Sequence, residues 1–256
     1  MDIEAYEDGV PSWVELTTPD PAGAGFYGRL FGWTYREPSG AARRTGLLRG
    51  RPVAAVGHDP DTEQAAWTMY VNVADADRTA EKVTVAGGSV LRAPHDLGTA
   101  GRAALFADHS GARFAVWQAG AHQGAGAVAE PGTFSWSELI TDDPEKSAAF
   151  YGSVLGWTVS EPEGPLRRRA FRSDGRPRAG LLPRPPAMPA SVPPYWDVYF
   201  AVADAADAAE AVTGLGGSVL MPATAMEHGT IAVLTDPAGA VFTVSSAAPA
   251  AAAAQH

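Results

Sequence analysis

The sequence contains no cysteine and no long apolar segment. The absence of cysteine excludes disulfide bonds, metal centres with thiolate ligands, and thiol nucleophiles. No apolar stretch approaches the ~18 residues that a membrane-spanning helix requires. The two polar residues among residues 1–4, Asp2 and Glu4, are acidic, whereas a secretory signal peptide begins with basic residues. We therefore expect a cytoplasmic protein without membrane partners.

Basic residues are also scarce. The chain has 19 Lys and Arg against 29 Asp and Glu, which gives a formal net charge of -10 over 256 residues. Proteins that bind the phosphate backbone need clustered basic side chains, so no nucleic-acid partner is expected. With 46% hydrophobic and 19% charged residues, the chain can bury two ordinary globular cores. The remaining class of partner is a small molecule.

The same pattern of residues occurs twice. Residues 12–16 read Ser-Trp-Val-Glu-Leu and residues 135–139 read Ser-Trp-Ser-Glu-Leu, while residues 67–70 read Trp-Thr-Met-Tyr and residues 196–199 read Trp-Asp-Val-Tyr. A repeat this long is a duplicated globular domain, because solenoid units recur every ~20 to 50 residues. We predict a first domain over 8–119, a flexible linker over 120–132, a second domain over 133–246 and a disordered Ala-rich tail over 247–256.

Each domain contains a shorter period of two strand–helix units. An alternating run ends at an Asp, a helical pattern follows, and a Gly closes it, over residues 20–32, 75–87, 143–156 and 204–216. Three short β-rich runs follow each helix, which predicts a β-α-β-β-β module four times. Phe26 and Tyr27 begin an aromatic stripe with apolar residues four positions later, and this spacing is typical of a buried helix face.

The order of these motifs resembles the vicinal oxygen chelate superfamily, which includes glyoxalases, bleomycin resistance proteins and dioxygenases. The resemblance covers residues 10–246 and rests on five motifs. They are the Asp-Pro start of the helix, Phe-Tyr near its middle, Gly-Trp at its end, the Gly-Gly-Ser-Val strand and the Asp-Pro-x-Gly turn. The tandem form resembles actinobacterial two-domain proteins labelled as glyoxalase-like proteins or hydroxylases. The resemblance implies an α+β fold of two glyoxalase-like domains, each with paired βαβββ modules whose curled mixed sheets form a cup.

Members of this superfamily usually hold a divalent metal through His, Gln and Glu at fixed strand positions. The corresponding residues are Trp13 and Trp136 in the opening strands, Thr68 and Asp197 in the strands that open the second modules, and Ala115 and Thr243 in the closing strands. Asp197 is the only one of these that could supply a metal ligand, and one ligand does not make a site. We therefore expect no metal and no cofactor.

The histidines offer no obvious replacement site. They are His58, His95, His109, His122, His228 and His256, and no two of them have the spacing of a metal-binding pair. Surface or loop positions are the simpler interpretation. His58 and His228 fall at strand ends from which they could reach the cups, so both remain candidate ligand-binding residues.

Strand alternation predicts which side chains line each cup. Because side chains alternate across a strand, Glu15 shares a face with Trp13, and Glu138 shares a face with Trp136. The same rule adds Thr68 and Tyr70 to the first set, and Asp197 and Tyr199 to the second. A Glu that is desolvated beside indole would have a raised pKa and could act as a general acid or base. The alternative is that both Glu residues have a structural role.

Two functions remain open. The first is a binding protein for a small aromatic or carbonyl metabolite in a cup that has lost the metal ligands. The second is a metal-independent tailoring enzyme, an isomerase, cyclase or hydroxylase, with Glu138, Glu15 and Asp197 as its catalytic residues. In both cases Trp13, Thr68, Tyr70, Trp136 and Tyr199 would contact the ligand. Tandem duplication supplies the module pairing within one chain, so we expect a monomer or a weak homodimer.

Overall fold

The structure is a computed structural model, and it describes residues 5–36, 43–226 and 229–246. His228 and the Ala-rich tail predicted over 247–256 lie outside the described residues. Within them, no helix is long and apolar enough to cross a membrane.

The first domain consists of two modules, each with one helix and four strands. The first module comprises β1 (Pro11–Thr18), α1 (Gly23–Phe31), β2 (Thr34–Arg36), β3 (Arg43–Leu48) and β4 (Arg51–His58). The second comprises β5 (Ala66–Asn72), α2 (Ala76–Val85), β6 (Ser89–Asp96), β7 (Gly101–Ala107) and β8 (Arg113–Ala119).

The second domain repeats this order. Its first module comprises β9 (Phe134–Thr141), α3 (Pro144–Leu155), β10 (Thr158–Val159), β11 (Arg169–Ser173) and β12 (Arg176–Pro183). Its second comprises β13 (Tyr195–Ala201), α4 (Ala205–Gly214), β14 (Ser218–Met226), β15 (Gly229–Thr235) and β16 (Val241–Ser245).

Each domain forms one mixed eight-stranded sheet. The strand order is β2-β3-β4-β1-β5-β8-β7-β6 in the first and β10-β11-β12-β9-β13-β16-β15-β14 in the second. The opening strands of the two modules pair antiparallel, β1 with β5 and β9 with β13, and each opening strand is parallel to the last strand of its own module. The predicted α+β architecture of paired βαβββ modules is therefore confirmed.

The helix ends follow from local sequence. Asp143 accepts a hydrogen bond from the backbone N–H of Lys146 at the start of α3, and Gly156 closes that helix in the left-handed conformation, at φ 74°. The start of α1 differs from the sequence expectation. Asp20 caps a turn instead, by accepting from the N–H of Ala22, and the helix begins three residues later than Asp20, at Gly23.

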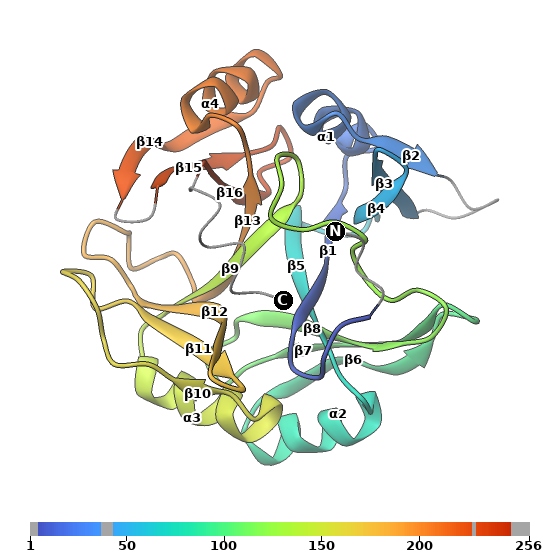
Figure 1. Cartoon of the computed structure of the whole chain (residues 1–256), viewed down its shortest axis with the longest axis vertical. Helices are drawn as coiled ribbons and strands as arrows, with labels where there is room; N and C mark the ends of the chain where they lie inside the picture. Colours follow the sequence, from blue (N-terminus) through green and yellow to red (C-terminus); the bar gives the residue numbers. More distant parts are fainter. Residues whose placement is uncertain (1–4, 37–42, 227–228, 247–256) are drawn as a thin grey trace.

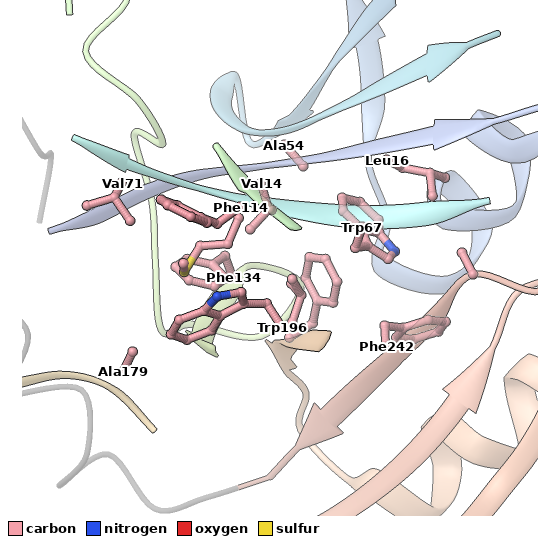
Figure 2. Close-up of a cluster of buried hydrophobic side chains, with 14 of the residues drawn as sticks. Val14, Leu16, Ala54, Trp67, Val71, Phe114, Phe134, Ala179, Trp196 and Phe242 are labelled. Carbon is pink, nitrogen blue, oxygen red and sulfur yellow. The ribbon is translucent and has the colours of Figure 1, made fainter. Parts of the chain in front are cut away.

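The two domains meet through their helices and the helix-bearing faces of their sheets. In Figure 1, α1 lies beside α4 at one end of the molecule and α2 lies beside α3 at the other, while the opening strands of the modules occupy the middle. A single hydrophobic cluster spans both domains; Figure 2 shows part of it, including Trp67 from β5, Trp196 from β13 and Phe242 from β16. The chain is thus one packed body with a shared core.

Two matching polar relays lock the domains together inside this core. Tyr27 of α1 donates to Asp236 Oδ2 of the second domain at 3.0 Å, and Tyr151 of α3 donates to Asp108 Oδ2 of the first at 3.1 Å. Trp67 and Trp196 donate from Nε1 to these tyrosine oxygens at 3.0 and 2.7 Å. The repeated Phe-Tyr and Asp-x-x-Gly motifs therefore serve the domain interface, where a buried hydroxyl must find a partner.

The segments that lead into each domain are held by the other domain in the same reciprocal way. Trp157 Nε1 donates to the carbonyl oxygen of Gly9 at 2.8 Å, and Trp33 Nε1 donates to that of Gly132 at 2.7 Å. Arg178 of β12 forms an ion pair with Glu7 at 2.6 Å. Burial of aromatic side chains stabilises the interface, and these directed bonds fix its geometry.

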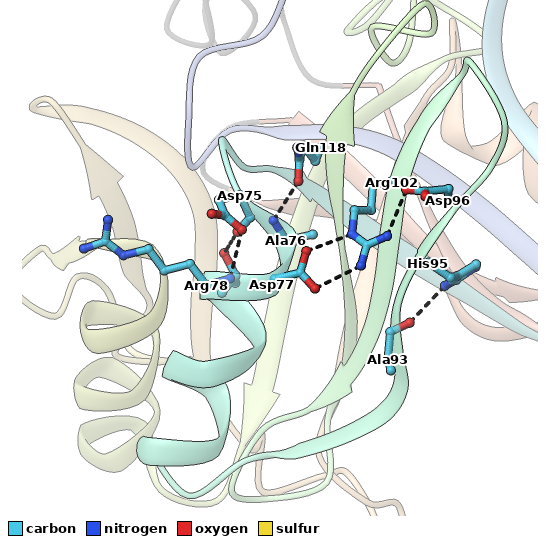
Figure 3. A network of polar contacts seen from close by, with 10 residues as sticks. Asp75, Ala76, Asp77, Arg78, Ala93, His95, Asp96, Arg102 and Gln118 are labelled. Carbon is cyan, nitrogen blue, oxygen red and sulfur yellow. Dashed lines mark hydrogen bonds and ion pairs between the residues drawn. The ribbon is translucent and has the colours of Figure 1, made fainter.

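One peripheral network exists in the first domain without a counterpart in the second. Arg102 of β7 pairs with Asp77 of α2 at 2.9 Å and with Asp96 of β6 at 2.8 Å (Figure 3). The positions equivalent to Asp77 and Arg102 in the second domain are Ala206 and Thr230, which carry no charge. This network ties α2 to the β6–β7 hairpin at the surface, where exposed ion pairs contribute little to stability.

Candidate small-molecule site

The register of the central strands brings the predicted site residues together on one face of each sheet. In the first domain Glu15 lies opposite Thr68, and Trp13 lies opposite Tyr70. In the second, Glu138 lies opposite Asp197, and Trp136 lies opposite Tyr199. We call the face with Trp13, Glu15, Thr68 and Tyr70 the first site face, and the face with Trp136, Glu138, Asp197 and Tyr199 the second site face.

Trp67 and Trp196 lie on the opposite sides of these strands. Both indoles belong to the hydrophobic cluster between the domains and bond to the tyrosines of the polar relays. The alternation of β5 and β13 separates them from the site faces. They act in domain packing.

On the first site face, Glu15 is held by two partners. Its side chain is buried, its Oε2 accepts a hydrogen bond from the Tyr70 hydroxyl at 3.0 Å, and its Oε1 lies 2.6 Å from a guanidinium nitrogen of Arg43. Burial raises the pKa of Glu15, and Arg43 and the Tyr70 hydroxyl oppose that shift by stabilising the carboxylate. Glu15, Tyr70 and Arg43 form a carboxylate–phenol–guanidinium triad.

The second site face repeats the triad. Glu138 is buried, its Oε2 accepts from the Tyr199 hydroxyl at 3.0 Å, and its Oε1 lies 2.6 Å from Arg168 Nε. A second guanidinium nitrogen of Arg168 donates to Glu138 Oε2 at 3.1 Å. Burial raises the pKa of Glu138, and the charge of Arg168 acts in the opposite direction.

Arg43 and Arg168 occupy equivalent positions, and sequence reasoning missed both. The pair Thr45–Ala55 in the first domain corresponds to the pair Ala170–Gly180 in the second. Arg43 lies two residues before Thr45, and Arg168 lies two residues before Ala170, so the two arginines are at the same point of each hairpin. The sequence has two consecutive arginines at 43–44 and three at 167–169. Their spacing from the repeated motifs differs between the domains, so only strand register aligns them.

The two site faces differ at three neighbouring positions. Where the first has Thr68, Ala115 and Ala55, the second has Asp197, Thr243 and Gly180. The Thr243 hydroxyl donates to Asp197 Oδ2 at 2.6 Å. Asp197 Oδ1, by contrast, is buried and has no hydrogen-bond partner among the described residues. A second carboxyl group thus exists on one face alone.

The surroundings of Asp197 favour its neutral form. Its side chain is 4% exposed. Burial raises the pKa of Asp197 to about 7, and the Thr243 hydroxyl opposes this shift by stabilising the carboxylate. The negative charge of Glu138 raises the pKa further, and the backbone N–H of Val198, which is not hydrogen-bonded to Oδ1, lowers it by the smallest amount. Asp197 therefore exchanges a proton near neutral pH, which an ordinary Asp does not do.

Gly180 explains how Glu138 fits against the neighbouring strand. A Cβ atom at this position would lie 2.5 Å from Glu138 Oε1. The backbone of β12 therefore approaches the carboxylate more closely than a residue with a side chain permits. The first domain tolerates Ala55 at the matching position, so its Glu15 lies differently against β4.

The first site face is covered by the segment that connects the domains. Ala125 of this segment is buried against Trp13, and its backbone N–H donates to the carbonyl oxygen of Ser12 at 2.8 Å. The ring of His122 lies edge-on to Trp13, with centroids 4.6 Å apart. The Tyr6 hydroxyl donates to the carbonyl oxygen of Ala125 at 2.7 Å. Residues 120–132, predicted as a linker, thus pack closely on the first domain.

Neither face fits the divalent metal that the superfamily usually holds. Among the described residues, no three His, Cys, Asp or Glu side chains form a group that could hold a metal ion. On the second face the guanidinium of Arg168 already forms an ion pair with Glu138, so this carboxylate is not available to a metal cation. Two carboxyl groups beside a fixed positive charge are a poor donor set for a second cation.

The candidate residue His58 does not join these clusters. His58 at the end of β4 lies on the opposite side of that strand from Gly57, and its Nε2 is 3.2 Å from the carbonyl oxygen of Pro19. His228 lies outside the described residues. His109 contacts the buried Ser147 hydroxyl at 3.3 Å, at the domain interface.

Comparison with known proteins agrees with this architecture. A family model described as "Glyoxalase-like domain" matches residues 13–117 and again 138–245. The "Putative glyoxylase CFP32" of Mycobacterium tuberculosis (strain CDC 1551 / Oshkosh) is 39% identical over 256 residues, covering 95% of this chain and 97% of the relative. The "Anthracycline biosynthesis protein DnrV" of Streptomyces peucetius is 35% identical over 260 residues, covering 93% of this chain and 94% of the relative.

Solved structures show the same fold at low sequence identity. The Mn(II)-bound glyoxalase from Novosphingobium aromaticivorans superimposes with a TM-score of 0.65 at 18% identity, covering 93% of this chain and 82% of that chain. The 2,3-dioxygenase LapB from Pseudomonas sp. KL28 gives a TM-score of 0.64 at 14% identity, with coverages of 94% and 93%. This chain belongs to the glyoxalase-like family of the vicinal oxygen chelate superfamily, with two tandem domains.

Proposed function

We propose that the protein binds a small oxygen-bearing aromatic metabolite on its second site face. The observation that carries this proposal is the unpartnered Oδ1 of Asp197, a buried polar atom at the centre of that face. Buried polar atoms in folded proteins are nearly always hydrogen-bonded, and a ligand that packs on this face is one way to supply the partner that Asp197 Oδ1 lacks.

The first site face supports the proposal by contrast. It has the same Glu–Tyr–Arg triad, Thr68 in place of Asp197, and the connecting segment packed on Trp13. A feature that both domains share is explained by stability of the sheet. Asp197, which only the second of the two site faces has, is therefore the better candidate for a functional residue.

The relatives are consistent with a ligand of this class. One of them, DnrV, is named an anthracycline biosynthesis protein, and anthracyclines are fused aromatic rings with carbonyl and hydroxyl groups. Trp136 on the second site face is partly exposed and lies opposite Tyr199, so an aromatic ring could pack on it.

A second candidate function is acid–base catalysis, and the pKa of Asp197 favours it. A carboxyl group with a pKa of about 7 can give or take a proton at neutral pH. Such a group could move a proton between a carbon and an oxygen of a bound ketone, which is an isomerisation that needs neither metal nor oxidant. Glu138 would then act as a positioning residue, because Arg168 and Tyr199 hold its carboxylate.

Ligand binding to matched variants tests the proposed function. The intrinsic tryptophan fluorescence and calorimetry of the purified protein would be followed against a panel of aromatic ketones, quinones and phenols. We expect binding at one site per chain, weakened at least tenfold by Asp197→Ala and unchanged by Thr68→Ala, the matching change in the first domain. Equal loss in both variants, or no binding by any compound, would refute the proposal.

A further inference from the structure

The hydrogen-bond pattern at Asp197 specifies what the second site face recognises. Thr243 donates its hydroxyl hydrogen to Oδ2 at 2.6 Å, so Oδ2 is occupied as an acceptor. When the carboxyl group is neutral, the arrangement that keeps this hydrogen bond as it stands places the carboxyl hydrogen on Oδ1. Oδ1 is the atom without a partner among the described residues. In that arrangement Asp197 presents a buried O–H donor with no acceptor among the described residues.

The charges around Asp197 point the same way. Glu138 faces it from β9 and is negative, with its charge balanced by Arg168. From β13 itself, Tyr195 and Tyr199 contribute only phenol groups whose pKa values burial raises. From β16, Thr243 contributes an uncharged hydroxyl. The cluster is neutral as long as Asp197 keeps its proton, so an anionic ligand would meet the uncompensated cost of a second buried negative charge.

We propose that Asp197 donates its Oδ1 hydrogen to a carbonyl oxygen of the ligand. The second site face then selects uncharged aromatic ketones or quinones over carboxylates, which add a buried negative charge, and over ammonium compounds, which cannot accept this hydrogen. This selection rests on the proposed function and gives it a ligand class. The ring of the ligand would pack on Trp136, and Thr243 would act as a positioning residue that determines which oxygen of Asp197 carries the hydrogen.

Four naphthalene compounds that differ in one polar group test this selection. They are 1,4-naphthoquinone, which only accepts hydrogen bonds, 1-naphthol, 1-naphthoate, and the 1-naphthylmethylammonium ion. The chain has no cysteine, so the quinone has no thiol to alkylate. At pH 6 we expect the quinone to bind at least tenfold more tightly than the naphthoate or the ammonium ion. Tighter binding of either ion would overturn the proposed selection.

Substitutions at Asp197 give an independent readout. Asp197→Asn imitates the neutral acid, because its amide oxygen can accept from Thr243 while its NH₂ group donates to the ligand. We expect this variant to bind 1,4-naphthoquinone about as well as the unchanged protein does at pH 6. Asp197→Thr, which copies the first domain, should lose at least tenfold in affinity. Equal binding by all three proteins would show that Asp197 does not contact the ligand.

The pH profile separates this selection from simple packing on Trp136. With a pKa of about 7, the neutral fraction of Asp197 falls between pH 6 and pH 8.5, and the quinone affinity should fall about 30-fold with it. The Asp197→Asn variant should show no such decrease, and Thr68→Ala should keep it. An unchanged affinity across this range would contradict the selection while leaving the proposed function intact. Failure of all four probes would refute both.

Discussion

The two domains are copies of one fold, and they differ most where a ligand would bind. Both sheets have a buried Glu held by a Tyr and an Arg, and both send a Tyr–Asp–Trp relay across the interface. The second domain alone adds a second carboxyl group, Asp197, whereas the first has its corresponding face covered by the connecting segment. Duplication has kept the stabilising groups in both copies and left one copy free to change.

The largest expected difference between the copies is in the pH dependence of stability. An unfolded Asp ionises near pH ~3.9, whereas folded Asp197 ionises near pH 7, so folding takes up a proton between these values. The contribution of Asp197 to the free energy of unfolding is full at low pH and is lost as the pH rises toward 7, by up to about 4 kcal/mol.

Urea unfolding of Asp197→Asn at pH 4 and pH 8 measures this contribution. Since Asn does not ionise, the variant should gain stability relative to the unchanged protein between the two pH values. Thr68→Asn, the matched change in the first domain, should show no such gain. Parallel pH profiles for all three proteins would mean that Asp197 ionises normally.

The close approach of β12 to Glu138 predicts the next largest effect. Gly180→Ala places a Cβ atom against the carboxylate, and crowding of this kind should lower the free energy of unfolding by about 2–3 kcal/mol. The reverse change in the first domain, Ala55→Gly, should cost about 1 kcal/mol through backbone entropy. Equal effects in urea unfolding would indicate that the two carboxylates lie in equivalent surroundings.

The shared triads predict matched effects in the two domains. Glu15→Gln and Glu138→Gln each leave an arginine without its buried counter-charge, and each should lower the free energy of unfolding by about 2 kcal/mol. The similarity of the two values is the informative result, since it identifies the triads as structural. If only Glu138→Gln abolished ligand binding while folding normally, that carboxylate would belong to the functional site.

The smallest effects should come from the domain interface. Tyr27→Phe and Tyr151→Phe each remove one hydroxyl that bonds to a buried Asp and receives a Trp N–H. Each should cost about 1–2 kcal/mol, because the aromatic packing remains. Differential scanning calorimetry should show a single cooperative transition in both variants. Two separated transitions would mean that the domains unfold independently.

Much of the fold could be predicted from sequence, because its signals are local or repeated. Trp13 and Glu15, two residues apart in a strand, had to share a face, and strand register confirms this arrangement with Tyr70 opposite Trp13. The aromatic stripe at Phe26 and Tyr27 was correctly predicted to be buried. The relation of these aromatics to the other domain could not be predicted, because it depends on how two complete sheets pack.

The partners of the carboxylates were harder to predict for a physical reason. Arg43 and Arg168 pair with Glu15 and Glu138, and they follow these residues by different distances along the chain (43 − 15 = 28 and 168 − 138 = 30), so sequence spacing does not align them. The chain contains other arginines in both domains that point elsewhere, such as Arg178, which pairs with Glu7 across the interface. Only the three-dimensional register distinguishes an arginine of the site from one of the interface.

We propose that the second site face, and not the first, binds the ligand. Nuclear magnetic resonance of the labelled protein during titration with 1,4-naphthoquinone can distinguish the two faces. We expect the shifts of backbone amide signals to concentrate on β13 and β16 around Asp197 and Thr243, with none of similar size on β5 around Thr68. Shifts centred on β5, or spread equally over both domains, would contradict it.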